Sequence, residues 1–346
     1  MFFSSQLYLD DLKATAEILK DNGVDGKSFL ITGASGLIGS YLVDALVYHA
    51  RFNGAKNRIY ALGRSEAKLK ERFAYADGEV NLVSADICAE LDDSVNYDYI
   101  IHAASNADPG TYARYPVETI QTNILGTHNC LKYAHSHPGT RMLLTSTMEV
   151  YGAMDKNGAI QEDEAGVVDF NTVRAGYPES KRVSELLVRS YAEEYGTDAL
   201  IARLGYIYGP TMTKADNKAV AQFIRSMIEK KDIVLKSEGL QNRSYCYVAD
   251  TVNAILFVLF KGEKAQAYNV ANELSTTTIA NLAKTAASIA GAKVIFDLPT
   301  ELEKKGFSPT RDAVLSENKL KALGWQGQYT LAEGLSRTAQ ILNSKT

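Results

Sequence analysis

The sequence contains few cysteines and no paired ones. Its 346 residues include three cysteines, Cys88, Cys130 and Cys246, which are widely separated and form no CxxC motif. An odd number of isolated cysteines favours neither a disulfide framework nor a zinc site. The five histidines show no HExxH or similar ligand spacing either. We therefore expect reduced cysteines and no bound metal.

Two further features are absent: an excess of positive charge and a long apolar run. The formal net charge is −4 and the isoelectric point is near 5.8, which provides no basic field for nucleic acid or an anionic membrane. No apolar run approaches the ~18 residues of a membrane span, and the first residues lack the basic segment of a signal peptide. These absences predict a cytoplasmic protein with no nucleic acid or membrane partner.

Hydrophobic residues make up 46% of the chain and charged residues 23%, which suits one large or two closely joined soluble domains. Apolar positions from Tyr8 to Leu19 recur at helical spacing, which predicts a helix ahead of the first strand. Strands and helices alternate after it, so we expect an α/β fold. The expected parts are an N-terminal helical extension (1–27), a dinucleotide-binding domain (28–205, with a return segment near 244–272), and a smaller C-terminal α/β substrate-binding domain (mainly 206–243 and 273–346).

A glycine-rich turn follows the first predicted strand, Ser28–Thr32. The first two of three spaced glycines let the backbone turn tightly and approach a pyrophosphate, and the third lets the following helix close on the sheet. The helix N-terminus also favours an anion. A glycine pattern alone fits a structural turn equally well, but its place between a strand and a helix favours a cofactor. The expected contacts here are Gly33, Ser35, Gly36, Leu37, Ile38 and Gly39.

The rest of the predicted cofactor site follows the next three strands. Arg64 follows the second strand, at the position where NAD-selective proteins commonly carry an acid for the ribose 2′-hydroxyl. A guanidinium there suits a 2′-phosphate, so NADP is favoured over NAD, although a solvated charge or stacking on adenine also fits Arg64. We expect Asp86 and Ile87 to flank the adenine. Small residues after the fourth strand leave room for the cofactor: Ala103, Ala104 and Ser105.

A candidate proton-transfer site comes from one helix and one strand. Tyr177 and Lys181 are four residues apart in a predicted helix, so an ammonium can lie beside a phenol and favour its ionised form. Thr147 follows a buried apolar run, at the strand end where open α/β sheets bind their ligands. Tyrosine and lysine at this spacing also occur by chance on solvated helices, so the pair alone does not establish a proton-transfer site. The cofactor turn that precedes the pair in the sequence supports that assignment.

The helices predicted over 117–134 and 177–195 carry apolar positions on more than one face. Each helix can bury one face on the sheet and another on a second subunit. We therefore expect a homodimer.

Together these segments resemble the extended short-chain dehydrogenase/reductase family that modifies nucleotide sugars, a family with a Rossmann-type doubly wound parallel sheet. The resemblance extends from Ser28 to the C-terminus. Its general marks are Thr32–Gly39, the Thr147, Tyr177 and Lys181 trio, Tyr208-Gly209-Pro210, Arg243 with Tyr247-Val248-x-Asp250, and Leu323-Gly-Trp325. Within the family the sequence is most similar to UDP-glucuronate decarboxylases, through Ser105–Tyr112, Ser146–Gly152, Arg174–Arg182, Gly209–Met212 and Gln241–Arg243.

The resemblance implies a nucleotide-diphosphate sugar as substrate and a tightly bound, recycled NAD or NADP. It also implies a homodimer packed through a four-helix bundle. The implied catalytic residues are Thr147, Glu149, Tyr177 and Lys181, and the implied substrate contacts are Tyr112, Tyr206, Lys218, Arg243 and Arg311.

Three positions depart from the decarboxylase pattern. Thr211 and Lys218 stand where the family has arginines, and Tyr206 stands where it has an asparagine. Lys218 can pair with a substrate carboxylate but lacks the bidentate fork of arginine, and a solvated side chain is the alternative. These departures bear on the sugar more than on the chemistry.

Two adjacent residues bear on the type of reaction. Glu149 favours a lyase, because similar 4-epimerases usually carry no acid there. Met148 stands where many 4,6-dehydratases carry a proton-donating aspartate, although some carry serine. Decarboxylation is therefore favoured, with 4-epimerisation and 4,6-dehydration as alternatives and a loop-fixing role open for Glu149. A catalytically silent dinucleotide sensor is a further alternative, but such proteins often lose the tyrosine or lysine.

Overall fold

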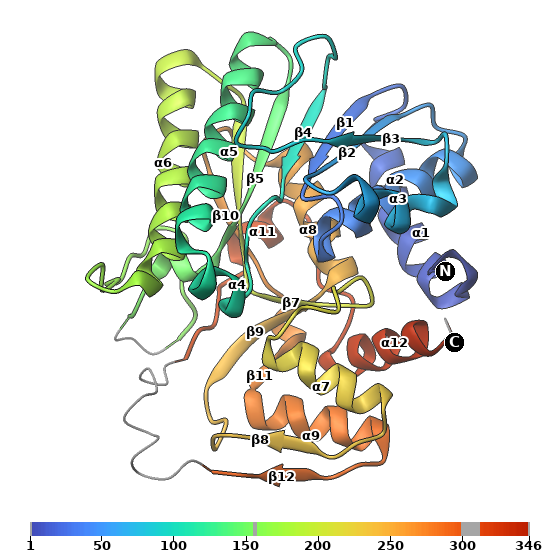
Figure 1. Cartoon of the computed structure of the whole chain (residues 1–346), viewed down its shortest axis with the longest axis vertical. Helices are drawn as coiled ribbons and strands as arrows, with labels where there is room; N and C mark the ends of the chain where they lie inside the picture. The colour runs from blue at the N-terminus through green and yellow to red at the C-terminus, as the bar shows by residue number, and fades with distance from the viewer. Residues whose placement is uncertain (1, 155–157, 299–311, 345–346) are drawn as a thin grey trace.

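A seven-stranded parallel sheet forms the larger part of the molecule (Figure 1). The computed structural model describes residues 2–154, 158–298 and 312–344. The strand order is β10-β6-β5-β4-β1-β2-β3, so the direction of winding reverses between β1 and β4. The strands are β1 (Ser28–Thr32), β2 (Arg58–Gly63), β3 (Val80–Ser84), β4 (Tyr99–His102), β5 (Arg141–Thr147), β6 (Ala199–Leu204) and β10 (Ala267–Val270).

Helices cover both faces of this sheet. The central strands β1 and β6 are buried along their whole length, as a parallel sheet between two helical layers requires. Phe29 and Ile31 pack in one core with α1 (Gln6–Asp21), α2 (Leu37–Asn53) and α8 (Val248–Lys261). Leu30, on the opposite face, packs in a second core with α5 (Pro116–Ser136) and α6 (Gly176–Tyr195). Figure 1 shows these two helical layers on opposite sides of the sheet.

A smaller α/β part lies beyond one end of the large sheet (Figure 1). It contains a three-stranded sheet of order β11-β9-β7 and a parallel pair, β8 and β12. Its strands are β7 (Tyr206–Tyr208), β8 (Ile233–Leu235), β9 (Asn242–Tyr247), β11 (Thr276–Thr278) and β12 (Val294–Phe296), and its helices are α7 (Ala219–Ile228), α9 (Ile279–Ala290) and α12 (Leu331–Asn343). Shorter helices outside this smaller part are α3 (Glu66–Phe73), α4 (Pro109–Arg114) and α11 (Asn318–Ala322).

The predicted fold class, a doubly wound parallel sheet with a smaller α/β part, is confirmed. The exact domain boundaries remain a prediction. The chain crosses between the two parts more than once: β9 pairs with β7 and β11 in the small sheet, and the following α8 and β10 pack in or against the large one.

Helix α1 is anchored by a buried carboxylate. Asp11 accepts hydrogen bonds from Tyr247 Oη (2.7 Å), Tyr329 Oη (2.8 Å) and Arg337 Nε (2.9 Å). Arg337 lies on α12, so this carboxylate joins the first long helix to the last. The N- and C-terminal helices accordingly lie side by side in Figure 1.

Within these described ranges, no helix combines the length and apolar character needed to cross a bilayer. In the same ranges no three histidine, cysteine, aspartate or glutamate side chains are grouped so that they could hold a metal ion. All three cysteines are free, and Cys130 and Cys246 are buried.

Candidate active site

The largest concentration of predicted site residues lies in a cleft at the carboxyl ends of β1, β4, β5 and β6. This is the point at which the winding of the sheet reverses, where open α/β sheets bind ligands. The cleft has a volume of about 250 Å³. Its lining includes Gly33, Leu37, Ile38, Gly39, Ala103, Ser105, Thr147, Met148, Glu149, Tyr177, Lys181, Tyr206 and Lys218.

The glycine turn has the tight backbone that a diphosphate cradle needs. Gly33 has φ of +65°, and a Cβ there would lie 2.7 Å from the carbonyl oxygen of Ala103. A Cβ on Gly39 would lie 2.5 Å from the carbonyl oxygen of Gly33. Helix α2 begins at Leu37 and directs its N-terminus at this turn. The residues present therefore fit the pyrophosphate of a dinucleotide.

A second cavity extends from the turn toward β2 and β3. Gly33, Gly36, Ala103 and Ser105 line both cavities, and Ser35, Arg64, Ile87 and Ala104 line the second one. Thr32 Oγ1 fixes their shared wall, because it accepts hydrogen bonds from the backbone amides of Ala103 and Ala104, both at 3.1 Å. The two cavities together have the extended form that a dinucleotide requires.

Two residues in the predicted adenosine region have other local roles. Asp86 is exposed and lines neither cavity, and its Oδ1 accepts a hydrogen bond from the amide of Cys88 at 2.9 Å. Ser65 Oγ accepts from the amide of Lys68 at 3.4 Å and so caps α3. Arg64 is exposed at the mouth of the second cavity.

Tyr177 and Lys181 both lie on α6 and are buried at the base of the cleft. Lys181 Nζ donates to the carbonyl oxygen of Thr145 at 2.9 Å, so this ammonium points at the backbone of β5. Burial lowers the pKa of Lys181 to about 8. Burial also raises the pKa of Tyr177 well above its ordinary value, and the charge of Glu149 raises it further. A hydrogen bond with Thr147 opposes both effects on the Tyr177 pKa.

The side chains of Tyr177, Tyr112 and Arg174 form a three-layer stack. The ring of Tyr112, from α4, lies parallel to that of Tyr177, with ring centroids 5.0 Å apart and an interplanar angle of 14°. The Arg174 guanidinium carbon lies 4.7 Å from the Tyr112 ring centroid, and Arg174 Nη1 is 2.9 Å from Glu149 Oε2. Tyr112 Oη is buried and forms no hydrogen bond with any described residue. Sequence reasoning missed Arg174 as a site residue, although a cation three positions before Tyr177 was a usable signal.

The predicted substrate contacts lie around the far end of the cleft. Tyr206 and Lys218 line it, and the Arg243 guanidinium carbon lies 5.6 Å from the Tyr206 ring centroid. Lys218 Nζ is 3.8 Å from Asp216 Oδ2. Thr211 is buried and its hydroxyl donates to the carbonyl oxygen of Leu37 at 2.8 Å, so it cannot replace an arginine there. Arg311 lies outside the described residues.

The sequence profile of the NAD dependent epimerase/dehydratase family matches residues 29–271. UDP-glucuronic acid decarboxylase 6 of Arabidopsis thaliana is 33% identical to this chain over 306 residues, which is 88% of this chain and 86% of that protein. This chain belongs to the epimerase/dehydratase family. The resemblance identified from the motifs is thereby confirmed.

Another relative and two solved structures are also similar to this chain. UDP-glucuronic acid decarboxylase 1 of Xenopus tropicalis is 31% identical over 318 residues, or 91% of this chain and 72% of that one. A crystal structure of dTDP-glucose 4,6-dehydratase from Streptomyces venezuelae with bound NAD superposes with a TM-score of 0.75 at 25% identity, covering 92% of this chain and 97% of that one. UDP-glucose 4-epimerase from Thermotoga maritima, with UDP-glucose, gives a TM-score of 0.77 at 24% identity, covering 92% and 99%.

Proposed function

We propose that this family member decarboxylates UDP-glucuronate by transient oxidation of the sugar at C4. The observation that carries the proposal is the position of Glu149. It lines the same cleft as Thr147, Tyr177 and Lys181, in a chain one-third identical to UDP-glucuronic acid decarboxylases. Similar 4-epimerases usually carry no acid at that position, so a carboxylate there favours a lyase.

The first step is removal of a proton from the sugar 4-hydroxyl. Bound NAD(P)+ supplies the acceptor for the hydride that leaves C4. Tyr177 takes the hydroxyl proton as general base. Thr147, whose side chain is hydrogen-bonded to Tyr177, orients the same sugar hydroxyl. Burial and Glu149 disfavour the phenolate of Tyr177. The role proposed for Lys181, one helical turn further along α6, is to favour the phenolate during turnover through its positive charge.

The second step is loss of carbon dioxide. Oxidation at C4 makes the C6 carboxylate part of a β-keto acid, so the carbon–carbon bond can break with its electron pair held as the C4 enolate. This enolate then takes up a proton at C5, and C4 is reduced again to give the pentose. Glu149 lines the cleft, and Arg174 holds its carboxylate in place through their 2.9 Å contact. Met148 lines the cleft but its thioether cannot protonate a departing hydroxyl, which argues against dehydration.

The proposed reaction is tested by mass analysis of products. The purified protein, with its copurified cofactor identified in the same sample, is incubated with UDP-glucuronate. Decarboxylation yields carbon dioxide and a pentose nucleotide lighter than the substrate by that mass. A product of unchanged mass with inverted C4 would establish epimerisation instead. Loss of water from UDP- or dTDP-glucose, with UDP-glucuronate untouched, would establish dehydration.

The proposed cofactor is NADP in preference to NAD. Support comes from Arg64, a cation at the mouth of the cavity that extends toward β2 and β3. No acid follows β2 at the position where it would bind a ribose 2′-hydroxyl.

The proposed assembly is a homodimer through α5 and α6. Their outer faces expose apolar side chains that a partner would cover, among them Val117 and Leu186, each 60% exposed. Leu186→Glu should convert the dimer to a monomer in sedimentation velocity at micromolar concentration. Leu240→Glu, at a residue 68% exposed in the smaller part of the molecule, should leave the dimer intact. A monomeric wild-type protein at that concentration would refute the assembly.

A further inference from the structure

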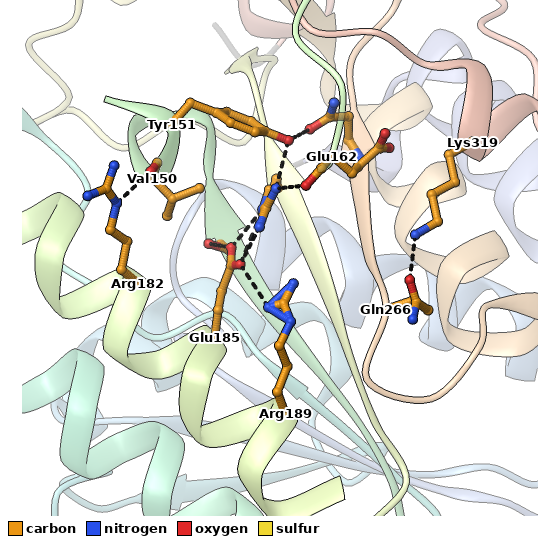
Figure 2. Close-up of polar contacts among 11 residues, drawn as sticks. Val150, Tyr151, Glu162, Arg182, Glu185, Arg189, Gln266 and Lys319 are labelled. Carbon is orange, nitrogen blue, oxygen red and sulfur yellow. Dashed lines mark hydrogen bonds and ion pairs between the residues drawn. The ribbon is translucent and has the colours of Figure 1, made fainter. Parts of the chain in front are cut away.

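A buried ion pair lies one helical turn beyond Lys181, outside the residues assigned to the reaction so far. Glu185 on α6 and Arg203 on β6 are 4% and 8% exposed. The guanidinium forms a forked contact with the carboxylate, with Nη2 2.7 Å from Oε2 and Nε 3.0 Å from Oε1. Figure 2 shows Glu185 at the centre of a set of polar contacts that also includes Tyr151, Glu162 and Arg189.

The pair is bonded directly to the strand that carries Thr147. Ser146 Oγ donates to Glu185 Oε1 at 2.7 Å, and Ser146 itself lines the cleft. Lys181, one turn earlier on α6, donates to the carbonyl of Thr145. The end of β5 is therefore hydrogen-bonded to α6 through two successive residues, Thr145 and Ser146.

Arg203 extends this connection to the segment that carries Glu149. Its Nη1 donates to Tyr151 Oη at 2.9 Å and to the carbonyl of Glu162 at 2.8 Å. Tyr151 ends the short 3-10 helix Met148–Tyr151, so Arg203 helps fix the helix on which Met148 and Glu149 lie. Every side-chain nitrogen of Arg203 has a bonded partner, which suits a rigid support.

The charges around Lys181 and Glu185 give this arrangement an electrostatic consequence. His102 on β4 faces Lys181 but stays neutral, because burial and the Lys181 charge lower its pKa to about 3. Burial lowers the pKa of Lys181, and the negative charge of Glu185 opposes this by raising that pKa. Glu185 is faced by Arg203 from β6, Ser146 from β5 and Arg189 from its own helix, whose Nη1 is 3.7 Å away.

A pair that only stabilised the core would require neither contact with the cleft-lining Ser146 nor a position one turn from Lys181. We propose that Glu185, supported by Arg203, is a positioning residue: it holds the end of β5 against α6 through Ser146 and, from one helical turn away, favours the charged form of Lys181 in the cleft that Tyr177 also lines. The part of the proposal that concerns turnover depends on the proposed function, whereas the part that concerns the charge of Lys181 does not.

The charge is tested without cofactor or substrate. Protein labelled with ¹³C at the lysine ε-carbon is titrated by NMR, and the Lys181 signal is assigned by its loss in Lys181→Arg. In Glu185→Gln, which keeps the side-chain shape, the pKa of Lys181 should fall by about one pH unit. Glu185→Asp, which keeps the charge, should lie closer to wild type. An unchanged titration in Glu185→Gln would overturn the proposal, and Glu179→Gln on the same helix is the control.

The positioning role is tested by the pH profile of kcat with UDP-glucuronate. The alkaline limb, which reports loss of the Lys181 proton, should move to lower pH in Glu185→Gln by about the same amount, with KM within about twofold. Glu185→Asp should keep the limb in place even where its kcat falls. If Glu185→Gln lowers kcat equally at every pH and does not shift the alkaline limb, the Glu185–Arg203 pair has only a structural role.

One variant covers the case in which Glu185→Gln does not fold. Ser146→Ala keeps the ion pair and removes only its bond to β5. Its kcat should fall several-fold in the folded protein, and a wild-type kcat would overturn the proposal. Absence of turnover in the wild type would count against the proposed function alone, because the lysine titration would still report on Glu185.

Discussion

Two regions of this protein bury charged groups and tyrosines, and they differ in how fully those groups are bonded. Around α1, Asp11 accepts hydrogen bonds from three side chains, and Asp44 on α2 likewise contacts Tyr8, Arg72 and Tyr75. In the cleft, Lys181 donates to one carbonyl oxygen, and Tyr112 Oη, whose ring stacks on the cleft residue Tyr177, bonds to no described residue.

This difference separates a structural network from a reactive one. A buried polar network in which every member is bonded makes the fold rigid. Removing one partner from such a network leaves an uncompensated buried charge, which lowers stability. Incompletely bonded groups reduce stability, and they are retained where they bind or transform a ligand. We therefore expect substitutions around α1 to lower stability and leave turnover unchanged, and substitutions in the cleft to do the reverse.

The largest expected effect is on turnover, in Tyr177→Phe. Loss of the proposed base should lower kcat with UDP-glucuronate by about 10²- to 10⁴-fold. The free energy of unfolding should not fall, because the phenol hydroxyl is buried at a cost. Tyr195→Phe, at an exposed position on the same helix, is the matched control. Wild-type turnover by Tyr177→Phe would show that the proposed mechanism is wrong.

The converse variant is Asp11→Ala. Removing the carboxylate leaves Arg337 without its buried partner, so the free energy of unfolding should fall by about 3–5 kcal/mol. Denaturant titration can be followed by fluorescence of Trp325, which is the single tryptophan and is buried. The kcat should be unchanged. Asp10→Ala, on the exposed side of α1, should cost less than about 0.5 kcal/mol. A large loss of kcat in the folded Asp11→Ala protein would break the comparison.

Glu149→Gln should have an intermediate effect, with two parts. The kcat should fall by about 10²-fold with little change in KM. Because the Glu149 charge raises the pKa of Tyr177, its removal should lower that pKa and shift the acid limb of the kcat profile to lower pH. A kcat profile identical to wild type would assign Glu149 to loop fixation only.

The smallest expected effect is in Arg64→Asp, at the far end of the cofactor cavity. The ratio of NADP to NAD affinity, measured on cofactor-stripped protein, should fall by about tenfold, because a carboxylate repels a 2′-phosphate and accepts from a 2′-hydroxyl. Arg58→Asp, at an exposed position at the start of β2, the strand that precedes Arg64, should leave the ratio unchanged. Preference for NAD in the wild type would contradict the cofactor proposal.

Local signals predicted most of the fold. The expected strand Ser28–Thr32 coincides with β1, because it is a short apolar run that ends at a glycine. The predicted helix over 177–195 matches α6 to within one residue. The strand end at Thr147 and the helical spacing of Tyr177 and Lys181 were sufficient to place all three in one cleft.

Contacts between residues distant in the sequence were not predictable in this way. Tyr112 and Tyr177 are 65 positions apart, and nothing in either local pattern indicates that the two rings stack. Glu185 reads as an ordinary polar position on a helix, and only the packing of α6 on β5 and β6 shows that it is buried against Ser146 and Arg203. The bonding partners of Asp11 lie 236 to 326 positions further along the chain.

The bonding of Asp11 has a consequence for synthesis of the protein on the ribosome. Helix α1 emerges well before Tyr247, Tyr329 and Arg337, which satisfy its carboxylate and lie 236 to 326 positions further along the chain. Domains generally fold as units during synthesis, N-terminal part first. Here the first helix cannot reach its final packing until translation has passed residue 337, so a nascent chain stalled before that point should still expose α1 to chaperones and proteases.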